Sequence, residues 1–180
     1  MKDWYHTEGE FGFIGIEKED FIKYMHKWAN DDKVTHFMLE GIYPSNVQKL
    51  EERYNELING SNVVFAIINK KNKEYIGTVG LYNIAWQARM AEFRIFLGNN
   101  KYHGKGLGTI ASKFMVKYAF YSLNLNKVWL GVNIENKGAV RCYEKAGFIK
   151  EGVLRQEVFR NNRYYDAIRM SILREEYEKL

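Results

Sequence analysis

The sequence contains one cysteine, one proline and no long apolar run. Cys142 alone cannot form an intramolecular disulfide, and a zinc site built from several cysteines is excluded. No apolar stretch approaches the length of a membrane span, and the opening "MKDWYHTEGEFGF" lacks the apolar core of a signal peptide. We therefore expect a cytoplasmic protein that does not act at a membrane.

Positive charge is in slight excess but is not gathered into one stretch. The 27 Lys and Arg residues outnumber the 22 Asp and Glu residues, which gives a net charge of +5 at pH 7. A nucleic-acid-binding surface would need a concentrated basic stripe, so no nucleic-acid partner is expected. A small anionic ligand needs only a few local positive charges. His6, His26 and His36 have no carboxylate or cysteine at ligand spacing, so no metal site is expected.

The length of 180 residues fits a single domain over 1–180. Periodic apolar residues predict the order β-α-α-β-β-β-α-β-α-β-β, which is a mixed sheet covered by helices of the α/β or α+β kind. The expected strands are 11–17, 63–70, 75–86, 90–97, 127–132, 148–158 and 163–173, and the expected helices are 20–29, 45–60, 106–122 and 136–147. The last seven residues, "REEYEKL", are expected to form a solvated helical tail.

One helix start is especially clear in the sequence. Ser45 is followed three residues later by Gln48, the spacing of a capping box, and an apolar face then recurs at helical spacing. Gly60 is expected to close this helix.

The stretch "KYHGKGLGTIASKF" places Gly104, Gly106 and Gly108 between an expected strand and an expected helix. The first turn of a helix has unpaired N–H groups and the positive end of the helix dipole, and glycines let an anion approach them. Lys105 adds positive charge and this first turn has no acid. The spacing fits neither a P-loop nor a Rossmann fingerprint. A tight turn eased by glycine, with no ligand, is the alternative.

The motif H-G-K-G-L-G-T, together with the later N-x-x-A-x-x-x-Y-E-K-A-G-F, resembles the GCN5-related N-acetyltransferase (GNAT) superfamily. The similarity covers most of the chain and is densest from Ala91 to Met170. It implies a GNAT-like, mostly antiparallel central sheet flanked by helices, and a transferase that uses acetyl-coenzyme A as co-substrate. Within the family, the C-terminal half looks most like the spermidine/spermine acetyltransferases.

The resemblance also implies which residues bind the coenzyme. In the family the glycine-rich loop holds the pyrophosphate, a helical Asn binds the cofactor, a small Ala leaves room for it and a Tyr reaches the thioester sulfur. The residues at these positions are His103, Gly104, Lys105, Gly106, Leu107, Gly108 and Thr109 on the loop, and Asn136, Ala139 and Tyr143 on the later helix. His103 departs from the family pattern, which usually has Gln or Arg there.

Transfer to an amine needs a base for the amine and an acid for the leaving thiolate. Tyr143 is the candidate acid, with a core tyrosine as the alternative. Glu92 is the candidate base. The alternatives are a water molecule as the base and a Glu92 that is only paired with Arg94 or Arg89. A backbone N–H near Ile95, Phe96 and Leu97 is expected to polarise the thioester carbonyl. Cys142 is read as a small buried hydrophobe, with an acyl-carrying thiol as the alternative.

The acceptor is expected to be a polyamine such as spermidine. Ribosomal-protein N-termini and amino sugars are alternatives within the family, and a non-catalytic CoA-binding module is an alternative outside enzymes. A polyamine site should be rich in acids, and four glutamates of the N-terminal helical arm could supply them, although they could also be solvated helix faces: Glu40, Glu51, Glu52 and Glu56. A homo-oligomer is compatible with this reading.

Overall fold

A computed structural model describes residues 4–38 and 41–180 of the chain. The chain divides into two compact units. The first contains the described residues up to Gly80 together with Ile95–His103, and the second contains Leu81–Arg94 and Gly104–Leu180. Two strands, β4 (Tyr75–Ala85) and β5 (Met90–Leu97), run from one unit into the other.

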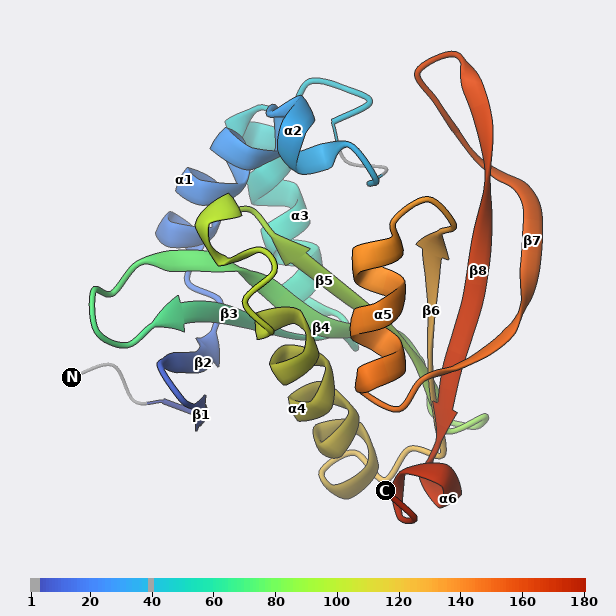
Figure 1. Ribbon diagram of the computed structural model, residues 1–180. Coiled ribbons are helices and arrows are strands. Elements are labelled where there is room, and N and C mark those ends of the chain that lie inside the picture. The colour runs from blue at the N-terminus through green and yellow to red at the C-terminus, as the bar shows by residue number, and fades with distance from the viewer. Residues whose placement is uncertain (1–3, 39–40) are drawn as a thin grey trace. The chain divides into compact units, whose positions relative to one another are not determined.

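In the first unit, β1 (His6–Glu8) and β2 (Phe11–Gly15) form an antiparallel pair, and β2 pairs antiparallel with β3 (Val63–Asn69). The strand order then continues from β3 to β4 and β5. Between β2 and β3 the chain forms α1 (Lys18–Ala29), α2 (Asp32–Thr35) and α3 (Val47–Asn59), which lie next to one another in Figure 1. A 3-10 turn, η1 (Asn100–Tyr102), follows β5.

Aromatic side chains pack where α1 meets the sheet of this unit. The rings of Tyr24 and Tyr75 are stacked, with centroids 4.8 Å apart, and Trp28 lies against both Tyr75 and Phe96. Trp28, Tyr75 and Phe96 are buried. The apolar side of α1 therefore holds the helix against the beginning of β4 and the end of β5, which is the strand that leads to the glycine-rich stretch.

The start of α3 corrects the sequence prediction. The N-cap is Asn46, whose Oδ1 accepts a hydrogen bond from the N–H of Lys49 at 2.9 Å. Ser45, the predicted cap, instead exchanges two hydrogen bonds with the side chain of Asn30. Both residue types can cap a helix, and the contact with Asn30 decides between them because it fixes the backbone of Ser45. The helix ends at Gly60 as predicted.

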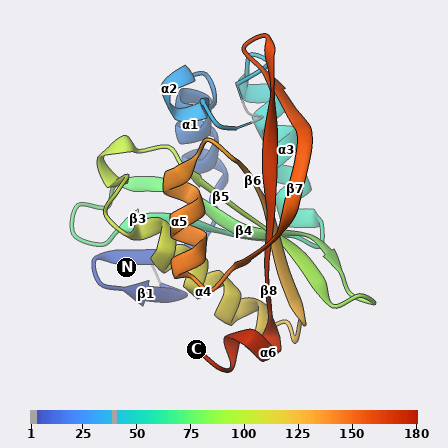
Figure 2. The same ribbon diagram turned by 45° about the vertical axis from the view of Figure 1, so that its right-hand side comes forward.

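In the second unit, the strand order is β4, β5, β6 (Lys127–Asn133), β8 (Arg163–Leu173) and β7 (Ile149–Arg160). The pair β5–β6 is parallel, whereas β6–β8 and β7–β8 are antiparallel. The strands β7 and β8 form a long ribbon (Figure 2). The helices α4 (Leu107–Tyr121) and α5 (Lys137–Lys145) lie side by side in both views.

The predicted fold class, a mixed and mostly antiparallel sheet with flanking helices, is confirmed. The short elements β1 and α2 were not predicted. The C-terminal tail is helical as α6 (Arg174–Tyr177), but it is not simply solvated, because the ring of Tyr177 packs on Phe120 of α4 at 5.5 Å. The single domain over 1–180 stays a prediction. None of the described helices has the length and apolar character needed to cross a membrane.

Gly77 of β4 offers a test of the close approach between β4 and the end of β5. A Cβ added at Gly77 would lie 1.9 Å from the carbonyl oxygen of Phe96, and that backbone atom cannot swing aside. We expect Gly77→Ala to destabilise the protein by about 3 kcal/mol or more. Gly15→Ala is the matched control, because a Cβ at Gly15 of β2 meets nothing within 4 Å, and it should change stability by less than about 0.5 kcal/mol. Urea unfolding of both variants measures the difference, and equal stabilities would contradict the packing described.

Candidate active site

The turn before α4 is built from left-handed glycines. Gly104 has φ +72° and Gly106, the N-cap of α4, has φ +80°. Residues with a Cβ rarely adopt this conformation, so the backbone itself favours glycine at both positions. A Cβ at either position would meet no atom within 4 Å. The protein therefore leaves the space beside both glycines open.

The first turn of α4 has no cap other than the backbone. No side chain caps the helix, the first turn contains no acid, and the first intrahelical bond of the series runs from the N–H of Ile110 to the carbonyl of Gly106. The N–H groups of Leu107, Gly108 and Thr109 precede that bond and have no acceptor within the helix. Together with the positive end of the helix dipole, they form a surface that favours an anion such as phosphate.

At Gly108 a glycine is needed for a different reason, which is helix packing. A Cβ at Gly108 would lie 2.9 Å from Sγ of Cys142, so this glycine lets α4 approach α5 closely. The Thr109 hydroxyl lies 3.5 Å from both the carbonyl oxygen and Sγ of Cys142. Burial is the largest influence on Cys142 and raises the pKa of its thiol, which keeps it neutral. This favours the reading of Cys142 as a packing residue over an acyl carrier.

Helix α5 brings three predicted residues onto one face. Asn136 is the N-cap, and its Oδ1 accepts a hydrogen bond from the N–H of Ala139 at 3.1 Å. Ala139 and Tyr143 follow at spacings of three and four residues, and both are only half-buried. No residue of α5 is fully buried, although one face carries Ala139, Val140, Cys142 and Tyr143. This apolar face therefore retains surface that a ligand can cover.

The ring of Tyr143 is held between two phenylalanines. Its centroid lies 5.9 Å from that of Phe93 on β5 and 6.0 Å from that of Phe148, with edge-to-face geometry in both pairs. Burial raises the pKa of Tyr143 well above its ordinary value, and the neighbouring Cys142 adds to the shift. Among the residues that the structure describes, none hydrogen-bonds to its hydroxyl. Tyr143 thus keeps its proton at neutral pH and can donate it to a ligand.

Glu92 of β5 is engaged by neighbours on the sheet. Arg94 donates to both of its carboxylate oxygens at 2.9 and 2.7 Å, and Asn83 donates at 2.8 Å. Successive residues of a strand point to opposite faces, and Phe93 contacts Tyr143. Glu92 therefore lies on the other face of β5, and the structure does not bring the candidate base and the candidate acid together.

The residues before the glycine turn also have defined contacts. The parallel register between β5 and β6 ends at Glu92, so Ile95, Phe96 and Leu97 lie beyond the part of β5 that pairs with β6. Nε2 of His103 lies 2.9 Å from the carbonyl oxygen of Leu97, which it can reach only as a donor. His103 thus binds its own chain six residues back. Lys105 is exposed.

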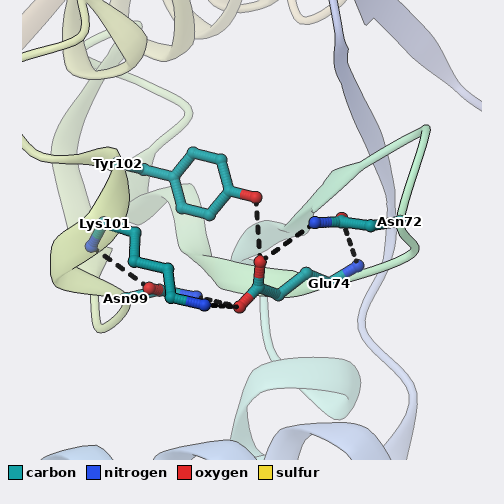
Figure 3. Close-up of polar contacts among 5 residues, drawn as sticks. All are labelled: Asn72, Glu74, Asn99, Lys101 and Tyr102. Atoms are coloured by element: carbon teal, nitrogen blue, oxygen red, sulfur yellow. Dashed lines mark hydrogen bonds and ion pairs between the residues drawn. The ribbon is translucent and has the colours of Figure 1, made fainter.

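Sequence reasoning missed one further residue, Glu74, near the start of β4. Figure 3 shows four side chains donating to its carboxylate. Three of them come from the segment between β5 and the glycine turn, which lies 25 to 28 residues further along the chain: Asn99, Lys101 and Tyr102. Hydrogen bonds from Asn99, and next from Tyr102, lower the pKa of Glu74. No local motif in the sequence marks such a long-range contact.

Comparison with known proteins identifies the family. Residues 11–149 match the family model of the acetyltransferase (GNAT) domain. The chain is 35% identical to spermidine N(1)-acetyltransferase of Vibrio cholerae, over 90% of this chain and 92% of that protein. It is 36% identical to the Escherichia coli K12 enzyme of the same name, over 90% and 85%. The crystal structure of the Vibrio cholerae enzyme in complex with CoA and spermine aligns with a TM-score of 0.85, at 34% identity over 94% of this chain and 98% of that one.

The chain therefore belongs to the acetyltransferase (GNAT) family. It is an acyltransferase that uses acetyl-CoA as co-substrate and transfers the acetyl group to nitrogen. Among residues 4–38 and 41–180, no group of three or more His, Cys, Asp or Glu side chains could hold a metal ion.

The contact between Gly108 and Cys142 predicts that Gly108→Ala lowers the stability of the wild type but does not lower that of a Cys142→Ala variant. Gly108→Ala should lower stability by about 1–2 kcal/mol, because the clash with Sγ outweighs the better helix propensity of alanine. In a Cys142→Ala background the clash is gone, and the same substitution should be neutral or stabilising by up to about 1 kcal/mol. Urea unfolding of the four proteins measures this, and additive effects would show that the two residues do not press on each other.

Proposed function

We propose that this enzyme acetylates a primary amine of a polyamine such as spermidine, by direct transfer from acetyl-CoA. The supporting observation is the identity of 35–36% to two spermidine N(1)-acetyltransferases over 90% of the chain. The net charge of +5 does not by itself favour a cationic substrate, so recognition would depend on local acids. In the N-terminal arm, Glu51 pairs with Lys18 and Glu52 accepts from Gln48. Glu56 is exposed, and Glu40 lies outside the described residues.

The proposal assigns acetyl-CoA to the glycine turn and to α5. The bare N–H groups of Leu107, Gly108 and Thr109 and the open space beside Gly104 and Gly106 fit a pyrophosphate. Lys105 and His103 would add contacts at the edge of this loop. The half-buried face of α5 with Asn136, Ala139 and Tyr143 would cover the rest of the coenzyme, and backbone N–H groups near Ile95, Phe96 and Leu97 would polarise the carbonyl. The coenzyme supplies an acetyl group activated as a thioester.

Tyr143 is proposed as the general acid. Its ring is fixed by Phe93 and Phe148, and its raised pKa keeps the hydroxyl protonated at neutral pH. A proton delivered to the departing sulfur would prevent reversal, because a free thiolate is a good nucleophile.

The base that deprotonates the amine is proposed to be either Glu92 or a water molecule. At pH 7 only about one amine in 2,500 is neutral for a pKa of about 10.4, so some group must accept a proton. The three hydrogen bonds that Glu92 receives from Arg94 and Asn83 support water in this role. A carboxylate so occupied has fewer free lone pairs for a substrate.

A ribosomal-protein N-terminus is the second candidate acceptor. The observation in its favour is 30% identity over 57% of this chain to a putative ribosomal N-acetyltransferase of Bacillus subtilis, whose own length is covered to 55%. The shorter coverage ranks it below the polyamine. The single cysteine is in keeping with a reducing compartment, which supports a cytoplasmic location, and a homo-oligomer stays a prediction.

The acceptor is tested with a panel of amines. We expect spermidine and spermine to show kcat/KM values at least about tenfold above those of peptides with N-terminal Ser or Ala, which corresponds to about 1.4 kcal/mol of transition-state stabilisation. Amino sugars complete the panel, and the release of free CoA is the measured signal. A preference for peptides or amino sugars would replace the polyamine with that acceptor.

Tyr143→Phe separates catalysis from packing. The variant keeps the ring between Phe93 and Phe148, so the affinity for acetyl-CoA should hold while kcat falls by about 10²–10⁴-fold. Because the pKa of Tyr143 is raised, wild-type kcat should rise with pH as the amine loses its proton and should show no falling limb from Tyr143 below about pH 10. A fall in kcat of less than about threefold would make Tyr143 a packing residue.

A further inference from the structure

The carboxylate of Glu74 collects an unusual number of donors. Oε1 accepts from Nδ2 of Asn99 at 2.8 Å and from Nζ of Lys101 at 3.4 Å. Oε2 accepts from the hydroxyl of Tyr102 at 3.0 Å and from Nδ2 of Asn72 at 3.2 Å. A carboxylate is the one side chain that accepts at both oxygens and donates at neither, so a neutral amide could not satisfy this set of partners.

The side chains of Asn99, Lys101 and Tyr102 attach their segment to Glu74 (Figure 3). Its backbone contacts to the sheet are the N–H groups of Gly98 and Asn99, which share the carbonyl oxygen of Ile76 at 3.1 Å each. The ring of Tyr102 is buried edge-on against Phe11. The hydroxyl of Tyr102 therefore reaches Glu74 from a ring that is itself held in place.

This segment lies between two residues assigned to the coenzyme. Leu97 precedes it and His103 follows it, and the two are joined by the contact between Nε2 of His103 and the Leu97 carbonyl. The chain from Leu97 to His103 is therefore a closed loop, with Glu74 bound at its middle.

We propose that Glu74 is a positioning residue for acetyl-CoA, which holds the 98–102 segment so that Leu97 and His103 are presented in the geometry that binds the coenzyme. This inference rests on the proposed assignment of the glycine-rich loop to the coenzyme. In this proposal Glu74 acts through the 98–102 segment rather than by touching the coenzyme. Its negative charge would repel a pyrophosphate, and of the donors from the segment only Lys101 carries a compensating positive charge.

The charge state of Glu74 determines how its effect on coenzyme binding should depend on pH. The pKa of Glu74 is lowered, so the ionised form stabilises the segment at every pH above the ordinary value of about 4.3 and this stabilisation is lost only as pH falls through the lowered pKa. Lys101 and Tyr102 are the titratable groups that face it. The contribution of Glu74 should therefore be constant between pH 6 and 8.

The test is Glu74→Gln, with Glu10→Gln as the matched control. Glu10 is also a carboxylate that accepts from an asparagine side chain beside the β3–β4 turn, Nδ2 of Asn69 at 3.1 Å, but it does not bind the 98–102 segment. We expect Glu74→Gln to raise the Kd for CoA and the KM for acetyl-CoA about tenfold, the scale of one lost charge-assisted hydrogen bond. The value of kcat at saturating acetyl-CoA should stay within about twofold, and Glu10→Gln should change none of these values.

Two further variants make the result decisive. Tyr102→Phe removes only a hydroxyl and should weaken CoA binding about threefold, and it should add nothing in the Glu74→Gln background, because both variants break the same contact. This smaller change also serves if Glu74→Gln does not fold. Unchanged CoA affinity in both variants, or a ratio of wild-type to variant Kd that changes between pH 6 and 8, would overturn the proposal.

Gly106→Asn separates this proposal from the loop assignment. Asparagine tolerates the left-handed conformation, and a Cβ at Gly106 meets no atom of the protein. If Gly106→Asn binds CoA as tightly as wild type, the loop assignment itself is wrong. If Gly106→Asn loses CoA while Glu74→Gln keeps it, the loop assignment stands and the positioning role of Glu74 is wrong.

Discussion

The left-handed turn before α4 is the constraint on which the site depends. Gly104 and Gly106 both have positive φ, and this bend brings the chain into α4 without a side chain over the first turn. A Ser or Asp N-cap has an extended backbone and accepts a hydrogen bond from one of the first N–H groups, whereas Gly106 is left-handed and has no side chain to do so. Because the first turn of α4 lacks a side-chain cap, an anionic ligand can bind its N–H groups and stabilise the helix start instead.

A turn of glycines is flexible in the unfolded chain, so its ends need firm attachment. On the N-terminal side, Glu74 holds Asn99, Lys101 and Tyr102. On the C-terminal side, the Cα of Gly108 lies against Cys142 of α5, where a Cβ would not fit. Each attachment uses a different kind of interaction, a charge-assisted hydrogen-bond cluster on one side and close helix packing on the other.

The sequence was informative where a feature depends on neighbours in the chain. The long helices, the long strands, the glycine-rich turn and the face of Asn136, Ala139 and Tyr143 follow from local spacing. Elements of three or four residues, such as β1 and α2, are too short to show periodicity. Asn46 replaced Ser45 as a cap because of a contact with Asn30, which lies 15 residues before Ser45. Three of the four partners of Glu74 are further away still, and no pattern in the sequence indicates them.

Glu92, which the sequence singled out, and Glu74, which only the structure revealed, both show that a carboxylate's role cannot be read from its position in the sequence. Glu92 drew attention because it stands on the strand before the glycine turn, yet Arg94 and Asn83 occupy its oxygens. Glu74 drew none, yet its oxygens hold the segment that leads to the turn. Sequence position identifies a titratable group, whereas its role depends on which donors the fold brings to it.

The proposed proton transfer from Tyr143 depends on a difference of two pKa values. A raised phenol pKa makes donation harder by about 1.4 kcal/mol for each unit, if the acceptor is a thiolate with a pKa near 8.5. The burial that raises the pKa of Tyr143 would act in the same direction on a thiolate placed beside the same aromatic rings, since a desolvated anion of either kind is disfavoured. The difference between donor and acceptor is then smaller than their values in water imply. The packing of Tyr143 against Phe93 and Phe148 is therefore compatible with a role as general acid. The same apolar surroundings would keep the phenol protonated before the reaction and would make the departing sulfur a stronger base.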